Sequence, residues 1–140
     1  MSIEEENKAL VRRVYELCNQ KKVEAAYNHY DTECVCHIPD GDISVKQAKD
    51  LDAMFFSAFP DINLTIVDII AEGDRVAYRG FVRTVHTSEF MGVPASGKEI
   101  AVSVIGFAKI EQDKIAEWWN YPDRLSWMQQ IGALPESGKQ

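Results

Sequence analysis

Hydrophobic residues in the first part of the chain recur every three or four positions, which is the spacing of one face of a helix. This pattern predicts an amphipathic helix over residues 3–19, with charged residues between the apolar ones. A second, short helix is expected over residues 23–30. Each helix should bury one stripe of its surface against the rest of the protein.

A strand is predicted over residues 33–38, followed by turn-forming residues at 39–42. Ser44 and Gln47 then have the spacing of a capping box, which marks the start of a third helix that should end before Pro60. The apolar face of this helix is predicted to consist of Ala48, Leu51, Phe55 and Ala58.

Beyond Pro60 the hydrophobic pattern changes to a period of two, as in strands with one buried face. Four such runs begin near residues 62, 75, 99 and 114, and turns or a loop with two glycines join them. Four strands in this arrangement predict an antiparallel meander. A last helix is expected from Asp123, its N-cap, to Gly132. The order of elements indicates an α+β fold in which the early helices pack on one face of a curved sheet.

The position of charged residues indicates which face of the sheet is buried. Arg79 and Arg83 share one face of the second strand, so the alternate residues should point toward the helices. The same parity applies to the third strand. The predicted inward residues are Val76, Tyr78, Gly80, Val82, Thr84, His86, Val102, Val104, Gly106, Ala108 and Ile110.

Four large apolar residues are left on the predicted outer face of the sheet: Phe81, Ile105, Phe107 and Trp118. Together they would expose more apolar surface than a monomer usually does. We therefore expect a homodimer that forms through the outer face of the sheet.

The last strand carries the candidate chemistry. If its two-residue period extends past Pro122, then Glu117, Trp119, Tyr121 and Asp123 point inward. Tyr78 and His86 on the second strand point to the same side, and His37 is available from the strand nearer the N-terminus. A carboxylate enclosed by aromatic rings is poorly solvated, so its proton affinity should rise into the range useful for acid/base catalysis. Asp123 is also an ordinary helix cap, and the two roles are compatible. Glu117 is a second inward carboxylate by the same parity.

Composition and charge narrow the function further. A chain of 140 residues fits one domain, spanning 1–140, and its net charge of −7 opposes binding to nucleic acid. No apolar run approaches the roughly 18 residues that a membrane span needs, and the start of the chain is acidic. Three cysteines cannot all pair within the chain. We expect a cytoplasmic protein with free thiols.

A metal site is not expected. Cys34 and Cys36 share one face of their strand while His37 points to the other, which leaves too few ligands for zinc. The chain also has no GxGxxG, Walker-type, HExxH or GxSxG motif. The functions that remain are catalysis without a cofactor and binding of a ligand without catalysis.

Several motifs occur in the order typical of the SnoaL-like polyketide cyclase family. They are AFPD at 58–61, EGDRV at 72–76, THT-like residues at 84–88 followed by EFMGVP, the KIAEWW run, and DRLSWMQQIG from Asp123. The chain resembles this family over residues 7–134, nearly its whole length. It departs from the family pattern at Ser88, at residues 94–97 and at Asp113, all in predicted loops or turns.

The resemblance implies a cystatin-like α+β barrel with a conical pocket, as in nuclear transport factor 2 and ketosteroid isomerase. It also implies a catalyst of intramolecular aldol ring closure that uses no metal or cofactor and has an aspartate as its acid/base. By motif position this aspartate is Asp123, and His86, His37 and Trp119 are its pocket companions. His86 would stabilise the developing oxyanion or orient Asp123.

Three functions remain open. The first is an enzyme of the cyclase or isomerase type that removes a proton alpha to a carbonyl of an apolar small molecule. The second is a module that binds such a molecule without transforming it. The third is an interaction protein whose pocket is filled by side chains and whose outer sheet face binds a partner.

Overall fold

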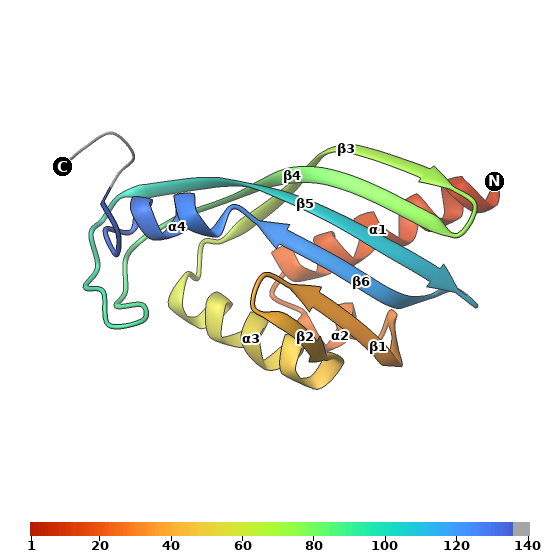
Figure 1. Cartoon of the computed structure of the whole chain (residues 1–140), viewed down its shortest axis with the longest axis horizontal. Helices are drawn as coiled ribbons and strands as arrows, with labels where there is room; N and C mark the ends of the chain where they lie inside the picture. The colour runs from red at the N-terminus through yellow and green to blue at the C-terminus, as the bar shows by residue number, and fades with distance from the viewer. Residues whose placement is uncertain (136–140) are drawn as a thin grey trace.

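The computed structural model describes residues 1–135 and has an α+β architecture, in which helices cover one face of a curved mixed sheet (Figure 1). The predicted fold class is therefore confirmed. In chain order the elements are α1 (Ile3–Asn19), α2 (Val23–Tyr27), β1 (Tyr30–Ile38), β2 (Gly41–Ser44), α3 (Val45–Ala58), β3 (Asn63–Glu72), β4 (Arg75–Val85), β5 (Glu99–Glu111), β6 (Lys114–Pro122) and α4 (Arg124–Gln130).

The sheet has the strand order β2-β1-β6-β5-β4-β3. Strands β3 to β6 form the predicted antiparallel meander. Two features differ from the prediction. The residues expected to form only a turn after β1 include a short strand, β2, and β1 pairs in parallel with β6, so that Cys36 lies beside Trp118. The first and last parts of the chain are thereby joined in one sheet.

The predicted helix starts are confirmed because they depend on local hydrogen bonds. Ser44 accepts from the backbone N–H of Gln47, and the Gln47 side chain accepts from the backbone N–H of Ser44, which completes a capping box for α3. Asp123 caps α4 by accepting from the backbone N–H of Ser126 at 3.0 Å.

The predicted inward faces of β4 and β5 are confirmed: their alternate residues are buried in two hydrophobic clusters. One cluster lies between α1, α2 and the strands and contains Tyr15, Tyr30, Tyr78 and Trp118 at or near its centre. The other lies between the end of α3, α4 and the strands. Its large members are Phe59, Phe90, Ile100, Trp127 and Ile131.

The predicted faces of β6 are wrong. Trp118 points inward and is 8% exposed, whereas Tyr121 lies on the outer face and is 46% exposed. The cause is a β-bulge: Lys109 pairs with Glu117, but the next residue, Ile110, pairs with Ile115. One extra residue in β6 moves every later side chain to the opposite face. Within residues 1–135 no helix is long and apolar enough to cross a membrane.

Candidate functional site

The predicted site residues do not come together in the structure but lie in three separate places. Tyr78 of β4 and His86, which directly follows β4, are buried in the interior, as expected. The β-bulge carries Glu117, Trp119 and Tyr121 to the outer face, where Trp119 stacks on His37. Asp123 lies at the surface between β6 and α4.

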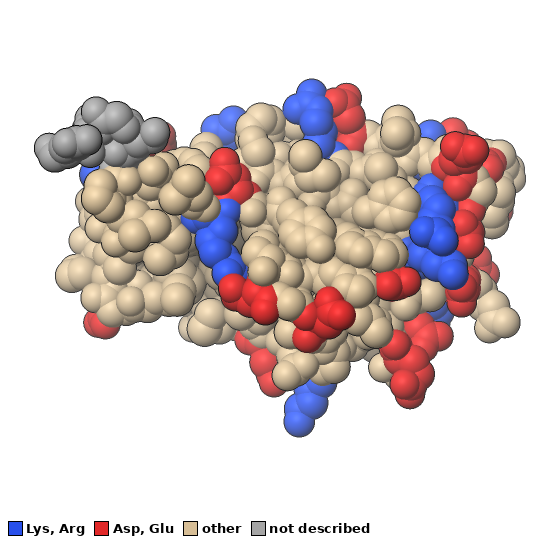
Figure 2. All heavy atoms as spheres, in the orientation of Figure 1, with Lys and Arg blue, Asp and Glu red and all other residues tan. Residues whose placement is uncertain are grey.

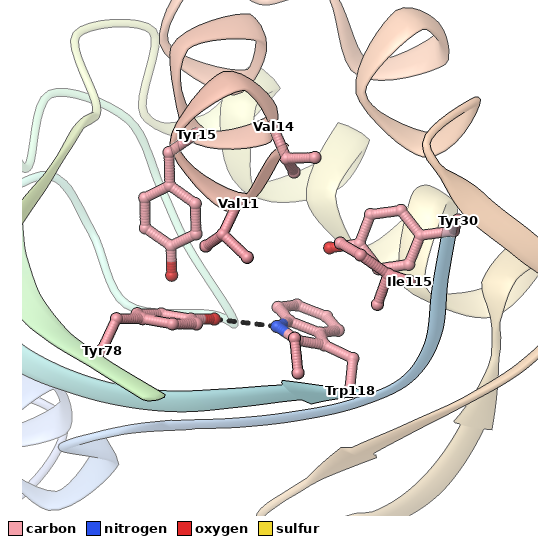
Figure 3. A pocket seen from close by; sticks show the side chains of 8 residues that line it. Val11, Val14, Tyr15, Tyr30, Tyr78, Ile115 and Trp118 are labelled. Carbon is pink, nitrogen blue, oxygen red and sulfur yellow. Dashed lines mark hydrogen bonds between the residues drawn. The ribbon is translucent and has the colours of Figure 1, made fainter. Parts of the chain in front are cut away.

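Tyr78 belongs to a closed aromatic group in the interior (Figure 3). Its hydroxyl accepts a hydrogen bond of 2.8 Å from the indole N–H of Trp118, and the ring of Tyr15 meets it edge to face. Gly106 lies beneath the Tyr78 ring, where a Cβ would stand 2.1 Å from the ring carbon Cζ. These side chains leave no space for a water molecule between them. This part of the interior is structural core.

His86 is completely buried and holds the loop between β4 and β5. Its Nδ1 accepts from the backbone N–H of Ser96 at 3.2 Å and lies 2.9 Å from the Ser96 hydroxyl. Because Nδ1 is an acceptor, the ring proton sits on Nε2. That Nε2–H group is buried and has no hydrogen-bond partner within residues 1–135.

Two further polar groups near His86 are buried without a partner in the described part of the chain: the hydroxyl of Thr84 and the indole N–H of Trp127. Thr84, near the end of β4, precedes His86 by two residues, and both are buried. The rings of His86 and Trp127 both pack on Phe59, at 5.9 and 5.0 Å between centroids. Sequence analysis predicted that Thr84 points inward, but it did not single out Thr84 or Trp127 as site residues, because their lack of partners depends on how α4 packs on the sheet.

Asp123 is not sheltered from water. Its side chain is exposed, and one carboxylate oxygen caps α4. The next residue, Arg124, forms an ion pair with Asp40 in the turn between β1 and β2. The sequence-based expectation of a carboxylate enclosed by Trp119 and Tyr121 is therefore wrong, since the bulge places those rings on the outer face.

The outer face instead carries a histidine held by two carboxylates. His37 Nδ1 lies 2.6 Å from Asp42, and Nε2 lies 2.6 Å from Glu117. The hydrogen bond to Glu117, followed by that to Asp42, raises the pKa of His37, because both favour the protonated ring. The ring also stacks on Trp119 at 4.9 Å. This cluster joins β1, β2 and β6.

A shallow groove of about 290 Å³ lies on the same outer face, lined by Arg75, Ile105, Gly106, Phe107, Trp119 and Tyr121. Viewed in the orientation of Figure 1, this face shows a broad area without charged groups over the strands, with Lys, Arg, Asp and Glu around it (Figure 2). Ile105, near its centre, is 62% exposed. The groove is open and apolar. It lies on the face of the sheet opposite to the buried, unpaired groups of His86, Thr84 and Trp127.

Within residues 1–135, Asp52 is a partly sheltered carboxyl that sequence analysis missed. It lies on α3 with its side chain half-buried, and its Oδ2 accepts a hydrogen bond of 2.6 Å from the hydroxyl of Tyr27. Burial raises the pKa of Asp52 to about 6, and the bond from Tyr27 offsets this only in part. Asp52 follows the buried Ala48 by four residues, so helical spacing alone could have placed it on the inner face.

Comparison with known proteins assigns the fold and the family. The model of the SnoaL-like polyketide cyclase family matches residues 8–131. The chain belongs to this family. A search of curated protein sequences found no significant match.

Solved structures agree with the family. AclR, a proposed hydroxylase from Streptomyces galilaeus, is 28% identical, with a TM-score of 0.89 over 97% of this chain and 87% of AclR. IdmH, a proposed polyketide cyclase from Streptomyces antibioticus, is 24% identical, with a TM-score of 0.83 over 90% of this chain and 98% of IdmH. A SnoaL-like polyketide cyclase from Agrobacterium tumefaciens is 19% identical, with a TM-score of 0.74 over 90% of this chain and 98% of that chain. These likenesses establish the nuclear transport factor 2-like fold, and the family supports a cyclase-like enzyme that binds small molecules.

Proposed function

We propose that this protein is an enzyme that uses no cofactor and removes a proton alpha to a carbonyl group of an apolar small molecule, as in aldol-type ring closure or isomerisation. The family supports a cyclase-like role in general terms. The observation that carries the finer proposal is Asp52, a sheltered carboxyl whose pKa of about 6 lies close to neutral pH. A carboxyl with such a pKa can both accept and return a proton under physiological conditions.

The proposed step moves one proton and one electron pair. A carboxylate oxygen of Asp52 takes the proton, the C–H bond breaks, and the electron pair moves onto the carbonyl to give an enolate. The enolate carbon then attacks a second carbonyl or regains a proton from Asp52. Tyr27 positions the carboxyl through its 2.6 Å hydrogen bond.

Asp123 remains a second candidate for proton transfer, supported by its position in the DRLSWMQQIG motif rather than by its surroundings. A ring closure needs an acid as well as a base, because the oxygen that becomes an alkoxide must be protonated. Asp123 is exposed at the junction of β6 and α4. In this proposal Asp52 acts inside and Asp123 acts at the surface.

The α-proton exchange of 2-tetralone, a bicyclic aromatic ketone, tests this function without knowledge of the natural substrate. NMR in deuterated buffer measures how fast the α-protons are replaced. The wild-type protein should accelerate the exchange, and Asp52→Asn should reduce the acceleration about a hundredfold or more. Asp50→Asn, on an exposed position of the same helix, is the matched control.

Asp123→Asn separates catalysis from capping, because asparagine caps helices as well as aspartate does. Reduced exchange with unchanged thermal stability would support a catalytic Asp123. A wild-type protein that binds the ketone but exchanges its protons no faster than buffer would contradict the enzyme and favour the alternative, a non-catalytic binding module. The closed packing around Tyr78 favours neither of these and instead fits the third function, an interaction protein whose pocket is filled by side chains.

We also propose that two copies of the chain associate through the outer face of the sheet. The exposed side chains of Ile105 and Tyr121 and the apolar groove beside them support this. Sequence analysis predicted the same surface, although it expected Trp118 there in place of Trp119 and Tyr121.

A further inference from the structure

The outer face of the sheet carries opposite charges on the two sides of β5. On one side, β4 bears the exposed residues Arg75 and Arg79. On the other side, Glu117 of β6 and Asp42 of β2 both lie 2.6 Å from His37. Even with a protonated His37, these three side chains together carry a net negative charge. Arg75 and Arg79 bond to acidic neighbours through Nε, so their Nη nitrogens can still bind another acceptor.

The register of β4, β5 and β6 arranges the side chains of this face in rows across the sheet. Residues directly opposite each other in neighbouring strands point to the same face. In the order β4, β5, β6 the rows are Arg75, Lys109 and Glu117; Ala77, Phe107 and Trp119; and Arg79, Ile105 and Tyr121. Each row has a residue of β5 in the middle and two unlike residues at its ends.

Two copies of the sheet that meet face to face are related by a two-fold axis that lies in the plane of contact. If this axis runs along β5, each residue of β4 faces the residue of the partner's β6 in the same row. Arg75 then faces the partner's Glu117 across the roughly 10 Å that separates packed sheets. The side chains of an arginine and a glutamate can together span this distance.

The other two rows are complementary in the same arrangement. Ala77, a small residue, faces the large ring of the partner's Trp119. Arg79 faces the partner's Tyr121, and a guanidinium is attracted to the face of a phenol ring. Trp119 is already fixed for this contact, because it stacks on His37 at 4.9 Å.

The centre of this contact is apolar. Phe107 and Ile105 lie on the axis and meet their own copies, and Ile105 is 62% exposed in the single chain. The second copy would also cover the apolar groove beside them (Figure 2). Lys109 lies on the axis too, but it bonds to Glu111 at 3.1 Å, so its charge is balanced within each copy. An apolar centre with polar residues around it is the usual composition of a protein interface.

Other directions of the axis bring like charges together. An axis along β4 places Arg75 against the partner's Arg75, and an axis along β6 places Glu117 against the partner's Glu117. An axis across the strands, along the row of Phe107, places Arg75 against the partner's Arg79. Like charges that face each other at an interface strongly oppose association. Of these directions, the axis along β5 is the one that pairs unlike charges.

We propose that two copies of the chain associate with their two-fold axis along β5, so that Arg75 of each copy pairs with Glu117 of the other. The proposal rests on the proposed association through the outer face, and it specifies which residues meet. Because both charge pairs form at once, the surface is complementary to a second copy of this chain.

Reversal of the two charges tests this arrangement. Arg75→Glu and Glu117→Arg should each weaken association at least about tenfold, because each variant brings like charges together twice in its own dimer. An equimolar mixture of the two variants should form a dimer again, because each substituted position then faces an unlike charge. Native mass spectrometry identifies the mixed dimer by its mass. Arg12→Glu, on an exposed position of α1, is the control.

A cross-link provides a second measurement that leaves both charges in place. Ile105 lies on the proposed axis, so a short bismaleimide should join two copies of Ile105→Cys. Thr65→Cys, on an exposed position of β3 two strands away from β5, should remain unlinked. This measurement decides the matter if circular dichroism shows that Glu117→Arg does not fold.

Three results would overturn the proposal. A wild-type protein that is monomeric at micromolar concentration would reject this arrangement together with the proposed interface. A wild-type dimer whose folded charge variants remain dimeric alone, or do not associate when mixed, would reject the arrangement and leave the interface standing. A dimer in which Ile105→Cys cannot be cross-linked would do the same. None of these results bears on α-proton exchange, so the proposed catalysis is tested separately.

Discussion

At the scale of single residues, Asp52 gains its properties from its surroundings. An aspartate on the surface of a helix is ionised at neutral pH, whereas Asp52 is half-buried between α2 and α3 and its pKa rises to about 6. The folded protein therefore binds a proton at Asp52 more tightly than the unfolded chain does. Between about pH 4 and 6 its stability should fall as the pH rises, and above this range the penalty persists.

Asp52→Asn should therefore stabilise the protein at neutral pH, because asparagine can accept the hydrogen bond from Tyr27 without an ionised group being buried. We expect a gain of up to about 3 kcal/mol at about pH 7, from a pKa shift of about two units, and little gain at about pH 4. Urea unfolding at both pH values measures this. A gain that does not change with pH would contradict the account.

The contribution of His37 to stability should be favourable in acid and disappear in alkaline solution, whereas ionised Asp52 is unfavourable at neutral pH. Its pKa is raised by Glu117 and Asp42, so its stabilising contribution is present below its ordinary pKa of 6.5 and is lost as the pH rises through the higher folded value. His37→Gln should cost on the order of 1 kcal/mol in mildly acidic solution and much less in alkaline solution. Thermal unfolding across this range tests it, and an equal cost at both ends would disprove it.

At the scale of elements, local patterns predicted what local forces determine. The capping box at Ser44 and the helix cap at Asp123 were predicted because their partners lie three residues away. The faces of β4 and β5 followed from the two-residue period. By contrast, β1 pairs with β6 across about eighty residues, and no pattern in either segment reveals a parallel partner.

The site was predicted only in part, for one main reason. The bulge after Ile115 reversed the faces of β6, so Trp119 and Tyr121 were expected inside while Trp118 occupies that place. His86 was identified correctly as an interior residue. Asp52 was missed because its shelter depends on Tyr27, which comes from another helix.

The contact between β3 and β4 offers a test at this scale. Gly80 faces the bulge of β3, and a Cβ there would stand 1.9 Å from the backbone oxygen of Thr65. Because backbone and not a flexible side chain is in the way, Gly80→Ala should destabilise the protein by about 1–3 kcal/mol or more. Denaturant unfolding measures the change, and an unaltered midpoint would show that the strands can separate without cost.

At the scale of the whole molecule, the two faces of the sheet differ in what they carry. The inner face and the helices enclose the unpaired donors and Asp52, whereas the outer face carries an exposed apolar groove. Apolar surface of this kind on a soluble protein usually marks an interface. A dimer through the outer face would leave the interior of each copy unchanged.

Ile105→Lys places a charge near the centre of the outer face without touching the interior. Sedimentation velocity should show a dimer for the wild type and a monomer for this variant, with equal far-ultraviolet circular dichroism. Asp50→Lys, an exposed change on α3 and therefore away from the outer face of the sheet, is a suitable control for charge alone. A wild-type protein that is monomeric at micromolar concentration would reject the proposed interface.

The pH dependence of the 2-tetralone exchange rate in the wild type and in Tyr27→Phe tests the central role of Asp52 most directly. The wild-type rate should rise with pH through a midpoint of about 6, as Asp52 becomes ionised. Tyr27→Phe removes the hydrogen bond that lowers the pKa of Asp52, so its midpoint should move to higher pH. The same midpoint in both proteins would contradict the account, because the titrating group would then not be the carboxyl that Tyr27 holds.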